Sequence, residues 1–150
     1  MNDVEMMTVA FEEAKAAYER GECPVGAVIV RDGEIIARAG NRETELKDPT
    51  AHAEILVMRE AGRLLNKHTF PDCIIYTTLW PCPMCANALL RAKIPKVVCG
   101  AKSFEYIYNE SFNPSRLIAE GPVMNDECRE IFVRWVKETG RQYILGNEEV

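Results

Sequence analysis

Two short stretches, His52-Ala53-Glu54 and Pro81-Cys82-Pro83-Met84-Cys85, decide how the rest of this 150-residue sequence is interpreted. Together they supply one imidazole and two thiolates, which are ligand types that a borderline-soft ion such as zinc prefers. Structural zinc sites fill all four tetrahedral positions from the protein, whereas catalytic sites leave one position for water or substrate. His52, Cys82 and Cys85 are three ligands, so the sequence predicts a catalytic Zn²⁺ site.

Both stretches are expected to open helices. Cys82 and Cys85 are three residues apart at the start of a predicted helix over 82–92, whose first turn tolerates Pro83. Unpaired N–H groups and the helix dipole at such a start lower the pKa of a thiol, which favours the thiolate that a metal needs. The helix start and the metal site therefore support each other.

Glu54 is the candidate catalytic carboxylate. Asp48-Pro49-Thr50 is a typical start signal for a second helix, over 50–65. On a regular helix His52 and Glu54 diverge by about 200° around the axis. Glu54 is therefore badly placed as a fellow ligand, but it could reach a water held by the metal and act in general acid/base catalysis.

The cysteine pair has two simpler interpretations. A Cys-x-x-Cys motif is often a redox pair, but that interpretation gives His52 and Glu54 no role. A closed structural zinc site would need a fourth protein ligand. The remaining candidates show no paired spacing: Cys23, Cys73, Cys99, Cys128 and His68.

These motifs resemble a known family. His52-Ala53-Glu54 with Pro81-Cys82-x-x-Cys85 is similar to the signature of the zinc deaminases of the cytidine deaminase superfamily. The longer stretch from Asp48 to Ile55 resembles the branch that holds tRNA adenosine deaminases, guanine deaminases and fungal-type cytosine deaminases. The likeness runs from about Met6 to Lys137. It implies a three-layer α/β/α fold with a mixed five-stranded sheet, one Zn²⁺ per chain and a homodimer.

The resemblance also implies substrate-binding residues. An Asn eleven residues before the metal His contacts the substrate in the family, and Asn41 stands at that offset. Val25 and the backbone N–H of Ala53 would line the same pocket, as would the N–H of Cys82. The alternative for Asn41 is a simple turn residue, since Asn favours loops.

Two aromatic residues are further candidates. Phe104 falls near the aromatic lid residue of the cytosine deaminases that the chain resembles. Trp80 departs from the family, whose members usually carry Glu or Ser before Pro-Cys, and a Trp there would narrow or cover the pocket. Core packing is the alternative for both residues.

The composition is that of an ordinary globular protein, with 47% hydrophobic and 27% charged residues, and predicts one domain over 1–150. Without a signal peptide or membrane span, the chain is expected to be cytoplasmic. Apolar patterns predict a helix over 3–20, a hairpin of strands over 24–30 and 34–39, and a polar loop through Lys47. Further strands are expected over 72–79, 96–100 and 116–121, and a last helix over 125–137 capped by Asn125.

Charge guides the substrate prediction. The net charge is −5, and residues 103–127 contain five acidic side chains against one basic. Proteins that bind nucleic acid normally carry a basic surface. We therefore expect a small-molecule nucleobase substrate, guanine or cytosine, that loses its exocyclic amine as ammonia. The alternative is tRNA adenosine deamination at the wobble position. A non-catalytic deaminase-like partner is a third possibility, but such a chain would be expected to lose Glu54.

Overall fold

The structure is a computed structural model that describes residues 2–102, 117–140, 144–145 and 148–149. Its main feature is a five-stranded sheet with the order β2-β1-β3-β4-β5. β1 is antiparallel to both of its neighbours, β2 and β3, whereas β3, β4 and β5 run parallel to one another. The strands are β1 (Gly26–Arg31), β2 (Glu34–Gly40), β3 (Cys73–Leu79), β4 (Lys96–Ala101) and β5 (Ile118–Glu120).

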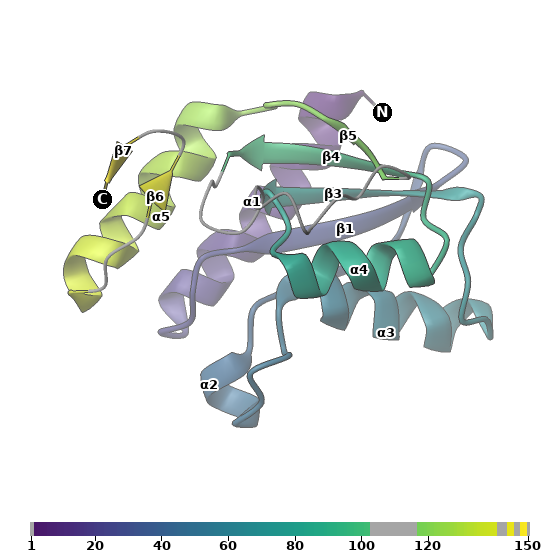
Figure 1. The fold of residues 1–150 in the computed structure, drawn as a ribbon, viewed down its shortest axis with the longest axis horizontal. Helices are drawn as coiled ribbons and strands as arrows, with labels where there is room; N and C mark the ends of the chain where they lie inside the picture. Colours follow the sequence, from purple (N-terminus) through teal and green to yellow (C-terminus); the bar gives the residue numbers. More distant parts are fainter. Residues whose placement is uncertain (1, 103–116, 141–143, 146–147, 150) are drawn as a thin grey trace.

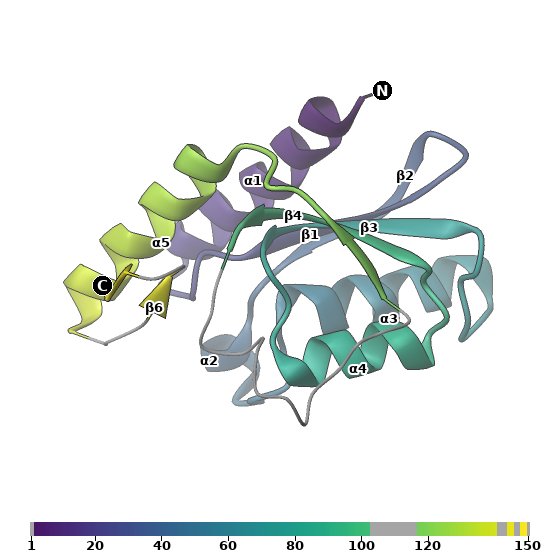
Figure 2. The same ribbon diagram turned by 45° about the horizontal axis from the view of Figure 1, so that its top comes forward.

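Helices cover both faces of this sheet (Figures 1 and 2). α1 (Asp3–Glu19) and α5 (Asn125–Thr139) lie on one face, and α3 (Ala53–Leu65) and α4 (Pro83–Arg91) lie on the other. A short helix, α2 (Glu43–Leu46), follows β2, and β6 (Ile144–Leu145) pairs with β7 (Glu148–Glu149). The predicted three-layer α/β/α fold with a mixed five-stranded sheet is confirmed.

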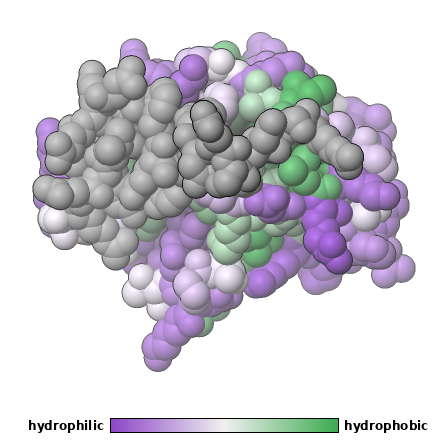
Figure 3. All heavy atoms as spheres, in the orientation of Figure 1, coloured by the Kyte–Doolittle hydropathy of each residue, from purple (hydrophilic) through white to green (hydrophobic). Residues whose placement is uncertain are grey.

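The core lies between the sheet and its two helical layers. Because helices cover both faces, the central strands are apolar on both sides, and Val28, Ile29, Ile75, Val97 and Val98 are completely buried. On the outside, Figure 3 shows hydrophilic residues over much of the drawn face, with smaller apolar areas between them. Across residues 2–102 and 117–140, no helix is both long and apolar enough to cross a membrane.

Several element boundaries differ from the predicted ones. The loop expected after residue 40 contains α2, and the two metal-bearing helices start later than expected, because His52 and Cys82 have extended backbones and are N-cap residues. The prediction that Asn125 caps the last helix is wrong. Met124 precedes that helix in a left-handed conformation (φ 58°), so Asn125 is already its first helical residue.

Candidate metal centre

The two helix starts that carry the metal motifs lie at the same edge of the sheet. α3 follows β2 and α4 follows β3, and these two strands run in the same direction because each is antiparallel to β1. The carboxyl ends of such strands are where open α/β sheets place their sites. The topology thus brings together residues that are thirty positions apart in the sequence.

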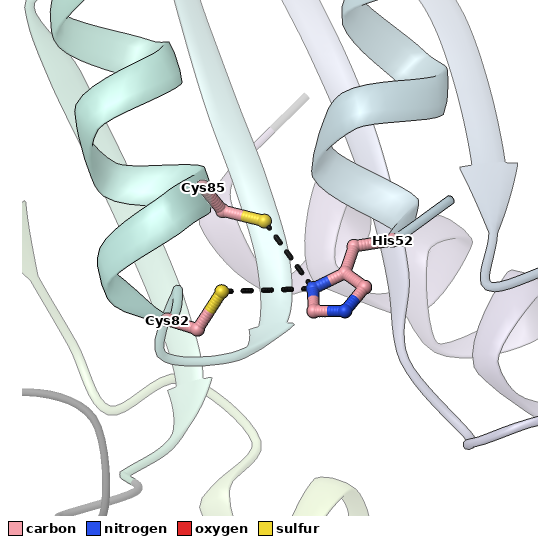
Figure 4. A group of neighbouring side chains, drawn as sticks. All are labelled: His52, Cys82 and Cys85. Atoms are coloured by element: carbon pink, nitrogen blue, oxygen red, sulfur yellow. Dashed lines mark hydrogen bonds between the residues drawn. The ribbon is translucent and has the colours of Figure 1, made fainter. Parts of the chain in front are cut away.

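His52, Cys82 and Cys85 point toward one another (Figure 4). The Nδ1 atom of His52 lies 3.4 Å from the Sγ atom of Cys85 and 3.6 Å from that of Cys82. All three ligand atoms lie within 4.8 Å of one another. Tetrahedral ligands at usual zinc bond lengths lie about 3.4–3.8 Å apart, so the group fits zinc. Three protein donors leave one coordination position for a further ligand.

The electrostatics of the group favour a thiolate. Hydrogen bonds from the Cys85 thiol and from His52 lower the pKa of Cys82 to about 4. The hydrogen bond to Cys82 in turn raises the pKa of His52 to about 9, while the same thiolate raises the pKa of Cys85. A negative sulfur is therefore already stable at the start of α4, where the helix dipole also favours it.

Glu54 lies beside this group in the first turn of α3. Its side chain is only 3% exposed, and its Oε1 atom accepts a 3.3 Å hydrogen bond from Thr77 Oγ1. Burial raises the pKa of the Glu54 carboxyl, although interactions with Cys85 and His52 act in the opposite direction. The carboxyl group faces the same cavity as His52 and Cys82. It is placed to exchange protons with a molecule bound there.

The cavity at the centre has a volume of about 120 Å³. Val25, Asn41 and Trp80, which the sequence analysis proposed for the pocket, all line it. Trp80 contributes its ring from the residue after β3, and its Nε1 atom is buried with no hydrogen-bond partner among the described residues. Phe104 lies outside the described residues, so its role as a lid stays a prediction.

Asn41 and Ala53 are bonded to each other. Asn41 is 3% exposed, and its Oδ1 atom accepts a 2.6 Å hydrogen bond from the backbone N–H of Ala53. Its Nδ2 atom donates to Glu43 Oε1 at 3.3 Å. Ala53 is completely buried, and its N–H is occupied by this bond. Asn41 therefore holds the start of α3, and its contact with a substrate stays a prediction.

Several residues that were not predicted from the sequence also line the cavity. Phe132 and Trp135 come from α5, with ring centroids 5.8 Å apart, and Glu43 comes from α2. Phe132 and Trp135 belong to the apolar stripe of the last helix, but the stripe alone does not tell which end of the sheet that helix covers. Cys23 and Leu79 also line the cavity.

Comparison with known proteins places this site in a family. Residues 1–101 match the family described as the cytidine and deoxycytidylate deaminase zinc-binding region. The chain therefore belongs to this family of zinc-dependent deaminases, and His52, Cys82 and Cys85 form its typical zinc site.

Individual relatives within the family include deaminases that act on tRNA and on guanine. The chain is 54% identical over 95 residues to a tRNA-specific adenosine deaminase of Aquifex aeolicus. The matched residues cover 63% of this chain and 63% of that protein, so the match spans less than two thirds of the relative's length. It is 43% identical over 97 residues to a guanine deaminase of Bacillus subtilis, covering 65% and 62% of the two chains. A structure from a study of A-to-I editing by tRNA:A34 deaminases has a TM-score of 0.80 and 39% identity, covering 85% of this chain and 98% of that chain.

Proposed function

We propose that this protein deaminates adenosine to inosine in tRNA. The observation that carries the proposal is the higher similarity to tRNA-specific adenosine deaminases than to guanine deaminase, 54% against 43% identity over similar lengths. The prediction from sequence charge was a free base, and the comparisons support its alternative better. Net charge is a sum over the whole surface, so it does not report the local field where an RNA loop would bind.

The site contains the groups that hydrolytic deamination needs. Zinc held by His52, Cys82 and Cys85 would supply a Lewis acid and lower the pKa of water. Glu54 would accept a proton from the attacking water, pass it to the ring nitrogen next to the reacting carbon, and protonate the leaving amine. One water is consumed and one ammonia is released, so the exocyclic amine is replaced by a carbonyl oxygen.

The cavity walls suit a flat heterocycle. Trp80, Phe132 and Trp135 bring three aromatic rings to the cavity, and such rings stack on bases without regard to sequence. A base that is turned out of an RNA loop would enter between them, because an enzyme reaches the amine only on an unstacked base.

Guanine deamination is the second candidate. The specific observation in its favour is the charge of one stretch of sequence: residues 103–127 have one basic side chain against five acidic ones. A neutral purine base needs no basic surface, whereas RNA affinity depends on neutralised phosphates.

An assay with both substrate classes tests the proposal. The zinc-loaded protein would be incubated separately with an RNA anticodon stem-loop carrying adenosine at the wobble position and with guanine, cytosine, adenine and adenosine. We expect inosine in the RNA and no ammonia from the free bases. Ammonia from guanine with unchanged RNA would replace the proposal by the second candidate. Zinc-loaded protein that deaminates none of them would indicate a non-catalytic partner.

A further inference from the structure

We propose that Glu43 is a positioning residue of the zinc centre, which orients the His52 ring from the side opposite the sulfurs. The inference rests on the zinc site and not on the identity of the substrate. Glu43 lies in a stretch that its sequence marks only as a polar loop, and neither of the two metal motifs contains it.

The two nitrogens of His52 face different partners. Nδ1 faces the sulfurs of Cys82 and Cys85, and Nε2 faces Glu43, whose Oε1 atom lies 3.5 Å away. An imidazole can bind a metal through Nδ1 only when its remaining proton is on Nε2. A carboxylate beside Nε2 stabilises that proton and fixes the plane of the ring, as outer partners of metal-bound histidines do.

The carboxylate of Glu43 is held in place. Asn41 Nδ2 donates to Glu43 Oε1 at 3.3 Å, and Asn41 Oδ1 accepts from the N–H of Ala53, the residue after His52. Contacts thus run from the His52 ring to Glu43, on to Asn41 and back to Ala53, the residue after His52. Through these contacts the positions of Glu43 and of the α3 start depend on each other.

Glu22 fixes the short helix that carries Glu43. The side chain of Glu22 is 3% exposed, and its two oxygens accept hydrogen bonds of 2.9 Å from the backbone N–H groups of Thr44 and Glu45. A buried carboxylate that bonds two backbone N–H groups anchors the first turn of α2 firmly. Glu43 is the first residue of that turn, so its backbone has little freedom to move away from His52.

Metal affinity provides a test that needs no substrate. Zinc dissociation constants would be measured by competition with a chromophoric chelator for the wild type, Glu43→Ala and the control Glu45→Ala. Glu45 is the matched control because it lies in the same helix with the same charge, but its side chain pairs with Arg42 at 2.8 Å on the surface. Visible absorption of the cobalt-loaded proteins would report the ligand geometry.

We expect Glu43→Ala to weaken zinc binding 10- to 100-fold, the usual effect of removing an outer partner of a metal ligand. The cobalt absorption bands should also shift in this variant. Glu45→Ala should stay within about twofold of the wild type in affinity, since an exposed pair contributes little. Equal affinities and equal cobalt spectra for the two variants would overturn the inference.

A second variant and a kinetic measurement also test the role of Glu43. If Glu43→Ala fails to fold, Glu43→Gln is tested instead. It should weaken zinc binding by at least about threefold, because an amide oxygen accepts a hydrogen bond less strongly than a carboxylate does. Unchanged zinc affinity in Glu43→Gln would then overturn the inference. A variant that raises KM with wild-type zinc affinity would make Glu43 a substrate contact, which also contradicts it. Because the zinc affinities and cobalt spectra use the metal alone, they stand even if the proposed substrate is wrong.

Discussion

At the scale of the residue, the proposed proton transfer by Glu54 can be tested directly by substitution. It is buried beside the sulfurs but is not one of the three metal donors. Replacing Glu54 with Gln removes its ability to exchange protons while keeping its shape. We expect deamination to slow by about 10²–10⁴-fold, the usual share of acid/base catalysis, with full zinc content. Ammonia release and metal analysis of the same sample check this, and wild-type turnover would remove Glu54 from the reaction.

Asn41 gives a second prediction at this scale. Replacing Asn41 with Ala leaves the buried N–H of Ala53 without its acceptor, so we expect the free energy of unfolding to fall by about 1–3 kcal/mol. The control is Asn87→Ala, which removes a hydrogen bond from an exposed side chain of α4 and should change stability by less than about 0.5 kcal/mol. Denaturant unfolding measures both, and equal losses would show that the Asn41 contact is unimportant.

At the scale of the element, the packing of α1 on β1 depends on a glycine. A Cβ atom at Gly26 would lie 2.0 Å from the carbonyl oxygen of Ala10 and 2.6 Å from the backbone nitrogen of Ala14. Both atoms belong to the α1 backbone, which cannot yield as a flexible side chain could. The close approach packs α1 directly on β1. Val25, the residue before β1, lines the cavity.

We therefore expect Gly26→Ala to destabilise the protein by about 3 kcal/mol, the upper end of the usual cost of overpacking. Gly21→Ala is the comparison, because Gly21 has a positive φ of 83° but no atom within 4 Å of its added Cβ. Its cost should be about 1–2 kcal/mol, from backbone conformation alone. Chemical denaturation of both variants measures these costs. A smaller loss of unfolding free energy for Gly26→Ala than for Gly21→Ala would show that α1 shifts freely.

Sequence reasoning succeeded where periodicity and motif spacing carry the information. The strands after Pro24 and the metal ligands follow from local patterns, and the likeness to the deaminases implied the three-layer arrangement. α2 could not be predicted, because its four residues, Glu43–Leu46, lack an apolar face and are stabilised by distant Glu22. Phe132 and Trp135 were assigned to a helix correctly, but their approach to the cavity depends on tertiary packing that no local pattern encodes.

At the scale of the whole molecule, zinc should stabilise the fold. His52 and the two cysteines join α3 to α4, and they form a preorganised site only in the folded chain. Free zinc at 100 times its dissociation constant would stabilise the protein by about 2.7 kcal/mol. Removal with a chelator should therefore lower the unfolding temperature by about 5–10 °C, as expected for a chain of this size.

Differential scanning calorimetry with and without chelator measures this shift, and added zinc should restore it. His52→Ala is the control, since a protein with one ligand missing should show little response to either treatment. An unfolding temperature that is independent of zinc in the wild type would contradict a preformed site.

The most direct test of the zinc centre is X-ray absorption at the zinc edge of the purified protein, combined with metal analysis. The site predicts one zinc per chain with two sulfur ligands at about 2.3 Å, one imidazole nitrogen and one further light atom that is not from the protein. Protein without zinc, or zinc with a fourth protein ligand such as a third sulfur, would contradict a catalytic site built on His52, Cys82 and Cys85.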